Sequence, residues 1–255
     1  ANSSVAYTVK NLNFTGVTLK KNVGKDNVAL GVAFARDGAY SPKYLTFENI
    51  SVTDSAIDQA DQGAAVIGYM SRFTNNTSIS FTGCKVNKFT AGTKDSTNKM
   101  NHCGAFIGKV ESLARTVTFK NCTANNIELY NVQNGGLFAG YINGTCTIKR
   151  TCTTKECRAV NGTITSRTAK GGGYSMGGLI GKAESILNIE GTTETPVSVQ
   201  NISIRETKHV DSTSNSYIGG VAGSAASTNI QNVDVENVRL AGKDLGGLIG
   251  CVNGG

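Results

Sequence analysis

Alternating apolar and polar residues recur along this chain in short stretches that share a break in the middle. The clearest stretch is residues 117–129, VTFKNCTANNIEL, in which the alternation shifts by one position at Asn121. Strict alternation is typical of a half-buried strand, and Asn or Gly accepts the left-handed backbone conformation of a sharp corner. The pattern therefore predicts two strands joined by a corner. Matching stretches with Asn or Gly at the corner occupy residues 7–14, 45–52, 79–86, 197–204 and 229–235.

A second pattern, rich in glycine and apolar residues, alternates with the first along the chain. Its best copy is residues 135–142, GGLFAGYI, in which Gly140 is the last glycine. Successive copies are 27 to 42 residues apart. A motif that returns at such intervals indicates one supersecondary unit stacked many times. Other clear copies end at Gly68, Gly108, Gly181, Gly223 and Gly250, and a weaker copy is expected to end at Ala35.

Together the two patterns predict three short strands in each unit, with the glycine motif as the third strand. In the best unit these strands are residues 117–119, 122–129 and 135–142. No stretch has the 3.6-residue period and the caps of a long helix. We therefore predict an all-β fold, a right-handed parallel β-helix, or β-solenoid, of about seven irregular three-stranded coils. Because the repeat covers the sequence, we expect a single β-solenoid domain over residues 1–255.

Length variation between the units is concentrated in polar segments just before the glycine motif. Insertions at one place in a solenoid repeat emerge on one side of the rod, which predicts a variable contact surface there. A further insertion, residues 183–196, follows one glycine motif and is expected to form an extra hairpin or a lateral strand. The segments before the motif are residues 58–62, 91–102, 131–134, 166–175, 205–217 and 242–244.

Neither end of the sequence resembles the polar unit that caps a solenoid. Strand-like sequence begins by Val5, and the chain stops just after a complete GGLIGCV at residues 246–252. Open strand edges and exposed core positions favour pairing with other strands. The sequence therefore indicates either a fragment of a longer chain or a subunit that stacks end to end. Head-to-tail contact that does not close generates a filament.

The formal net charge of +7 comes from scattered lysines and arginines, with no basic run. A solubilising surface explains this charge, and the absence of Trp disfavours platforms for base stacking. We therefore predict no nucleic-acid partner. No apolar run approaches the roughly 20 residues of a membrane span, so no span is predicted.

Seven cysteines are present without a CxxC pair, which disfavours a zinc ribbon or a redox motif. Cys84 and Cys122 hold the same position in successive units, where either a disulfide or simple core packing is expected. The three cysteines within residues 146–157 are close enough in sequence to bridge locally, and Cys251 is the candidate for a bond to another chain. Extracellular disulfides are favoured over buried free thiols. The disulfide candidates are Cys84, Cys103, Cys122, Cys146, Cys152, Cys157 and Cys251.

Nine Asn-x-Ser/Thr sequons occur, a high density to which the abundance of Asn, Ser and Thr contributes by chance. Asn49, Asn121 and Asn201 are expected at the corner, where the turn explains the asparagine with or without a glycan. Sequons between the strands are the better acceptors in a secreted protein. These are Asn75, Asn76, Asn143 and Asn161, and the other glycosylation candidates are Asn13, Asn49, Asn121 and Asn201, with one more sequon at Asn2.

Residues that carry chemistry are sparse. The two histidines, His102 and His209, both lie in polar segments, where a solvated side chain is the usual outcome. No HExxH or Asp-rich calcium motif is present. A glycan-processing site needs clustered carboxylates and aromatic platforms, which the sequence does not indicate, so we predict no catalytic residue, metal or cofactor. The positions most able to hold a site are Asp58, Asp61, Lys94 and Asp95.

The glycine motifs and corners resemble those of repeat-containing surface proteins of the GLUG-motif and polymorphic-membrane-protein type. The resemblance covers nearly the whole chain through short motifs, and it implies a β-helix with a cell-surface or adhesive role and no catalytic residue to transfer. The motifs are GLIG at residues 178–181 and 247–250, FENI at residues 47–50 and FKNC at residues 119–122.

These features predict an extracellular structural glycoprotein, at the cell surface or secreted, whose subunits stack end to end into a filament and whose partner is a second copy of itself. One alternative is an adhesin or binding segment of a larger surface protein, with glycans or cell surfaces as partners. The second alternative is a β-helix glycan lyase or hydrolase. The assembly state separates filament from adhesin, and a carboxylate-lined groove on the loop side would favour the enzyme.

Overall fold

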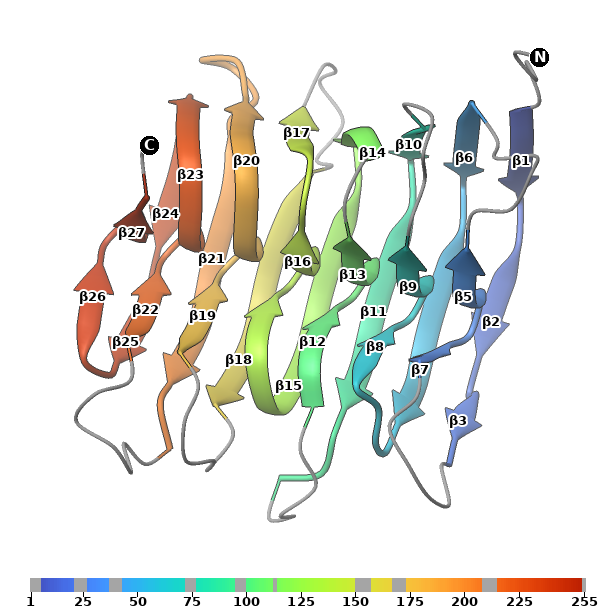
Figure 1. Cartoon of the computed structure of the whole chain (residues 1–255), viewed down its shortest axis with the longest axis horizontal. Coiled ribbons are helices and arrows are strands. Elements are labelled where there is room, and N and C mark those ends of the chain that lie inside the picture. The colour runs from blue at the N-terminus through green and yellow to red at the C-terminus, as the bar shows by residue number, and fades with distance from the viewer. Residues whose placement is uncertain are drawn as a thin grey trace.

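The structure of the protein is a computed structural model that describes residues 6–20, 27–36, 43–71, 77–94, 100–111, 114–149, 157–166, 173–207 and 215–253. Over these residues the secondary structure consists of β-strands and turns, without a helix. Every strand pairing is parallel. The predicted all-β parallel solenoid is confirmed, and Figure 1 shows its coils stacked side by side along the long axis.

Each coil contributes strand segments at four positions, which belong to two sheets. The first sheet holds the first and fourth positions. First-position strands are β1 (Ala6–Lys10), β6 (Tyr44–Glu48), β10 (Thr77–Thr82), β14 (Ala114–Lys120), β17 (Thr145–Lys149) and the ends of β20 (Ile180–Glu190) and β23 (Ala222–Gln231). Fourth-position strands are β5 (Val32–Arg36), β9 (Ile67–Ser71), β13 (Ile107–Glu111), β16 (Ala139–Ile142), the starts of β20 and β23, and β27 (Ile249–Val252).

The second sheet holds the second and third positions. Second-position strands are β2 (Asn13–Thr15), β3 (Thr18–Leu19), β7 (Ser51–Ile57), β11 (Lys85–Ala91), the start of β15 (Thr123–Gly136), β18 (Arg158–Ser166), β21 (Val197–Arg205), β24 (Val233–Glu236) and β25 (Arg239–Ala241). Third-position strands are β4 (Asn27–Ala29), β8 (Gln62–Ala64), β12 (Met100–Gly104), the end of β15, β19 (Tyr174–Gly177), β22 (Ser216–Gly219) and β26 (Asp244–Gly246).

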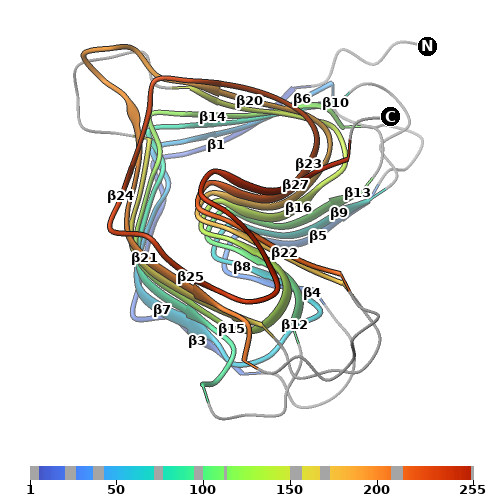
Figure 2. The same cartoon turned by 90° about the vertical axis from the view of Figure 1, so that its left-hand side faces the viewer.

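The solenoid is right-handed, as predicted. The chain descends along the second-position strands, rises along the third and fourth positions, and crosses the top in the first-position strands (Figures 1 and 2). Figure 2 views the molecule from its C-terminal end, and there the path runs counterclockwise as the coils approach the viewer.

The glycine motif is not a third strand, and this prediction was wrong. In the best copy, β15 ends at Gly136 and β16 begins at Ala139, so Leu137 and Phe138 form a turn that passes from one sheet to the other. The turn points into the interior, and both its side chains are fully buried. Because neither side of the turn faces water, its residues are apolar at consecutive positions, a pattern that also suits a fully buried strand.

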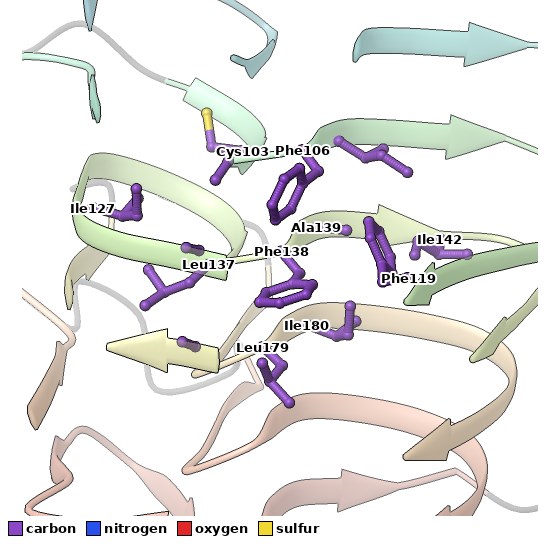
Figure 3. Close-up of a cluster of buried hydrophobic side chains, with 14 of the residues drawn as sticks. Cys103, Phe106, Phe119, Ile127, Leu137, Phe138, Ala139, Ile142, Leu179 and Ile180 are labelled. Carbon is purple, nitrogen blue, oxygen red and sulfur yellow. The ribbon is translucent and has the colours of Figure 1, made fainter. Parts of the chain in front are cut away.

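Aromatic side chains fill the core between this turn and the first-position strands. Phe81 of β10 stacks on Phe119 of β14, with ring centroids 5.0 Å apart. From the opposite side, the turn residues Phe106 and Phe138 approach Phe119 at 5.7 and 5.3 Å. Figure 3 shows the rings of Phe106, Phe119 and Phe138 together in the interior. Such aromatic contacts add to the stabilisation from burial, so the turn closes the core of each central coil.

The predicted corner between the first two positions is confirmed at Asn11, Asn49, Gly83, Asn121 and Asn232. Each has a positive φ, between 50° and 62°. This is the left-handed region that Asn and Gly tolerate best.

Asn201 does not belong to that corner, which corrects the prediction. It lies within β21, whose register places it beside Asn161 of β18. A second corner therefore bends the second-position strand, with φ of 53° to 55° at Asn126, Asn161 and Asn201. Residues 183–196 are neither an extra hairpin nor a lateral strand, because the end of β20 is the regular first-position strand of that coil and pairs with β17 and β23. The weakest glycine motif ends at Ala33 rather than Ala35, because Val32 pairs with Ile67.

Candidate functional site

The third- and fourth-position strands diverge from the buried turn as two walls (Figure 2). Residues of both walls line a pocket, and the space between the walls is called the groove. Strand register stacks equivalent residues of successive coils on each wall. The third-position wall carries Gln62, His102, Asn134, Ser175, Tyr217 and Asp244. The fourth-position wall carries Tyr69, Lys109, Tyr141, Lys182, Ser224 and Cys251.

The last glycine of each motif brings the two walls together at the base of the groove. A Cβ atom on Gly140 would lie 2.4 Å from the backbone nitrogen of Cys103 and 2.8 Å from the carbonyl oxygen of Asn134. Gly181 and Gly223 approach the opposite strand in the same way. Close approach of two backbones is a recurrent reason for glycine within strands, and here it explains why the last residue of the motif is Gly in six copies.

Tyrosine and lysine alternate along the middle of the fourth-position wall. The Nζ atom of Lys109 lies 5.4 Å from the ring centroid of Tyr69 and 5.3 Å from that of Tyr141. Lys182 covers Tyr141 from the next coil at 5.6 Å. At such distances the ring face attracts the ammonium group. The lysines and rings therefore hold successive coils together on this wall.

Each of these lysines is also paired with a glutamate of its own strand. Lys109 lies 3.0 Å from Glu111, and Lys182 lies 2.7 Å from Glu184. The hydroxyl of Tyr69 donates a hydrogen bond to Glu111, which with Lys109 lowers the pKa of that carboxyl group. Burial raises the pKa of Glu184, but hydrogen bonds from Lys182 and Tyr141 outweigh it and the net shift is downward. Both carboxylates are therefore ionised at neutral pH and neutralise the lysines.

The groove opens into a cleft of about 500 Å³ over its C-terminal half. Its polar lining consists mainly of amides and hydroxyls. Ser175 and Ser224, one from each wall, are both buried and join at an Oγ–Oγ distance of 3.0 Å. Asn134, Tyr217 and Lys182 also line the cleft.

Towards the N-terminus the walls are in direct contact. The His102 ring lies 5.1 Å from the Tyr141 ring, and His102 Nδ1 lies 2.9 Å from the side-chain nitrogen of Asn134. His102 is thus a half-buried wall residue of β12, whereas the sequence indicated a solvated loop residue. Burial, followed by the hydrogen bond with Glu184, raises the pKa of Tyr141 far above its usual range.

The acidic positions singled out from the sequence do not form a catalytic arrangement. Asp61 accepts a hydrogen bond from Asn101 at 3.0 Å, a structural contact between coils. Asp58 directly follows β7 and Lys94 is the third residue after β11, while Asp95 and His209 lie outside the described residues. Among the described residues, no group of three His, Cys, Asp or Glu side chains is arranged to hold a metal ion.

The six cysteines within the described residues are free thiols, and Cys152 lies outside them. Cys84 and Cys122 stack on successive coils as predicted and pack in the core, with Cys157 on the coil that follows. The hydrogen bond between the first two lowers the pKa of Cys84, while burial raises that of Cys122. Burial alone raises the pKa of Cys146 far above its usual range.

The predicted sequons occupy different environments. Asn13 and Asn49 are exposed, Asn143 is half-buried in the turn after β16, and Asn121 is only 9% exposed. Asn2, Asn75 and Asn76 lie outside the described residues.

Asn161 and Asn201 are exposed but lie within strands, so Asn161 is not the linker residue that the sequence indicated. The side-chain nitrogen of Asn161 donates to Asn125 at 3.0 Å, and that of Asn201 donates to Asn161 at 3.2 Å. The ladder extends to Asn87 at one end and to Asn237 at the other. These amide nitrogens, which an N-glycan would use, thus already join successive coils.

The first and last described coils expose positions that are buried in the central coils. Leu12 at the N-terminal end is 43% exposed, and Leu245 and Val252 at the C-terminal end are 49% and 55% exposed. In central coils the position of Leu245 is held by Met176 and that of Val252 by Ile142, and both of these side chains are fully buried. Both end faces are therefore apolar surfaces bounded by strand edges.

Within the described residues, no helix is long and apolar enough to cross a membrane. Comparison of the chain with protein-family models, with curated proteins and with solved structures found no match.

Proposed function

We propose that this protein is an extracellular structural protein whose solenoids stack end to end into a filament. The observation that carries the proposal is the match between the two end faces. If the first coil of a second copy followed the last coil in register, Val9 would lie on Ile230 and Leu19 on Leu240. Each pair is apolar. The residues that stack between them in the same two columns are all apolar too, for example Phe81 and Leu129.

The backbone of the end coils supports the same arrangement. Asn11 and Asn232 form the same corner at the two ends, with φ of 57° and 50°. Strands β1 to β5 pair on one side with the next coil. The end of β23 and strands β24 to β27 pair on one side with the preceding coil, while the start of β23 pairs with both β20 and β27. A parallel strand edge is a template for a further parallel strand. A second copy placed in register would continue both sheets and cover both apolar faces.

This contact joins two different faces, so it is heterologous and does not close on itself. Repetition of such a contact produces an open filament. The partner in this proposal is a second copy of the chain, and the role is structural rather than catalytic. The exposed sequon at Asn13 supports a glycosylated protein at the cell surface or in the extracellular space, whereas the side-chain nitrogen of Asn49 already donates to Asn11 at 3.3 Å. Mass spectrometry of the native protein would detect glycan at Asn13.

Electron microscopy and sedimentation velocity of the chain over a range of concentrations test the stacking. We expect fibres whose axial repeat equals one solenoid, in equilibrium with single rods at low concentration. Leu245→Lys places a charge on an end-face residue that is already half exposed, so the coil should fold while the fibres are lost. Asp234→Asn, which changes an outward residue of the same coil, is the matched control and should leave the fibres intact.

Single rods at every concentration would refute self-stacking. The end faces would then pair with coils other than those of a second copy of the chain. Fibres that persist unchanged with Leu245→Lys would refute the proposed joint, because assembly would then use a different surface.

A further inference from the structure

We propose that the cleft in the C-terminal half of the groove binds a neutral, linear oligosaccharide that lies along the solenoid axis. The proposal concerns a lateral surface of one solenoid and does not depend on end-to-end stacking. It rests on the charge balance of the cleft, on its hydrogen-bonding groups, and on its direction.

The charge balance favours an uncharged ligand. Lys182 is the one charged side chain among the described residues that line the cleft, and it is paired with Glu184 at 2.7 Å. An anionic ligand would have to displace this pairing, and a cationic ligand would find no carboxylate in the lining. The side chains that remain are amides and hydroxyls, which donate and accept hydrogen bonds without carrying charge.

The hydrogen-bonding groups suit a ligand with many hydroxyls. Asn134 uses its side-chain nitrogen with His102, which leaves its carbonyl oxygen to accept a bond from a ligand hydroxyl. Asn215 and Asn253 add two further amides to the lining, and the side-chain oxygen of Asn253 accepts a hydrogen bond from Cys251 at 3.0 Å. The Ser175–Ser224 hydroxyl pair can donate one proton beyond its own hydrogen bond. The volume of about 500 Å³ falls within the range of roughly 300–1,000 Å³ that is usual for ligand sites.

Two tyrosines line the cleft, Tyr217, which is half-buried, and Tyr174, which is only 3% exposed. Both faces of Tyr141 are engaged, since Lys109 and Lys182 approach it from the coils on either side. Tyr217 is half-buried on the opposite wall and lines the cleft directly. A tyrosine side chain combines an apolar ring face with a polar hydroxyl group at its tip. This combination suits a sugar ring, which has an apolar face and hydroxyls at its edge.

The direction of the cleft favours a polymer. Its walls are built from equivalent residues of successive coils, stacked about 4.8 Å apart along the axis. Asn134, Ser175 and Tyr217 are consecutive members of one wall. A ligand made of repeated units therefore meets a repeated set of polar groups, whereas a compact ligand would use only one or two of them.

Calorimetric titration with hexasaccharides tests this inference, with cellohexaose, laminarihexaose, maltohexaose and chitohexaose as neutral probes. Heparin and galacturonan oligosaccharides are the anionic probes. The Leu245→Lys background is used so that stacking does not contribute heat. We expect saturable binding of at least one neutral probe, with an affinity that changes little between low and high salt, because no ion pair forms with the ligand.

Variants locate the binding. Tyr217→Ala and Asn134→Ala should each weaken binding by about tenfold or more, as expected when a central contact is removed. Tyr217→Phe should retain most of the affinity, because the ring remains. Thr118→Ala, on the outer face of β14, is the control and should bind like the parent.

Three results would overturn the proposal. They are the absence of binding to every neutral probe, binding of anionic probes only with loss at high salt, and binding that Tyr217→Ala and Asn134→Ala leave unchanged while both variants keep the circular dichroism of the parent.

Discussion

Replacement of Gly140 by alanine tests the contact between the two groove walls. The new Cβ would lie 2.4 Å from the backbone nitrogen of Cys103, well inside the separation of about 3.5 Å at which atoms pack favourably. Neither backbone is free to retreat, because β12 is paired with β8 and β15, and β16 is paired with β13 and β20.

The expected loss follows from the rigidity of these neighbours. Overpacking of a filled interior costs about 1–3 kcal/mol, and the upper end applies where backbone rather than a flexible side chain must move. We therefore expect Gly140→Ala to lower the free energy of unfolding by about 3 kcal/mol. For a chain of this size, such a loss lowers the melting temperature by roughly 6–12 °C.

The chain provides a matched control in another copy of the motif. A Cβ on Gly247 would have no atom within 4 Å, and its φ lies outside the left-handed region. Gly247→Ala should therefore be neutral or stabilise by up to about 1 kcal/mol, because alanine reduces the entropy of the unfolded chain.

Thermal and guanidinium unfolding followed by circular dichroism measures both variants. Because stacked repeats need not unfold in one step, midpoints of the whole transition are compared rather than extrapolated free energies alone. If Gly140→Ala melts within about 2 °C of Gly247→Ala, the argument that the walls are held in backbone contact is refuted.

Three further predictions concern the corners, the carboxylates and the thiols. Asn161→Ala should be less stable than Asn161→Gly by about 1 kcal/mol in denaturant melts, because both lose the amide ladder but only alanine strains the left-handed corner; equal stability would contradict this. The pKa of Glu111 is lower in the folded state, so its ionised carboxyl group stabilises the fold above the unfolded pKa of about 4.3. This stabilisation is lost as the pH falls through the folded pKa, so Glu111→Gln should flatten the decline in melting temperature between pH 5 and pH 3. Burial raises the pKa of Cys103 to about 12, so a thiol reagent should modify half-exposed Cys251 in the native protein and Cys103 only after unfolding; mass spectrometry that finds both modified together would refute this.

The strands and the first corner could be predicted from the sequence because their signals are local. The shift of alternation at Asn121 or Asn232 requires only the neighbouring residues and the tolerance of Asn for a positive φ. Asn201 was misassigned for the same reason, since a corner within the second-position strand gives the same local pattern. Only the register with Asn161 on the preceding coil separates the two corners.

The turn and the cleft depended on contacts between coils, which a single stretch of sequence does not contain. Gly136 and Gly140 look alike in sequence, but one begins the buried turn and the other touches the opposite wall. The cleft residues Asn134, Ser175 and Tyr217 differ in type and are separated by whole repeats. Because no motif links them, the predicted register of the coils was the one signal that would have grouped them.

The asparagine ladder has a consequence for how the chain reaches this structure. Its hydrogen bonds join residues 36 to 40 positions apart, which is the length of one coil. Since each coil needs only its immediate predecessor, a nascent chain can add coils in order as it leaves the ribosome, and stability accumulates from neighbour to neighbour. The phenylalanine-filled central coils would exchange their amide hydrogens last and the two end coils first, so the molecule unravels from its ends inward.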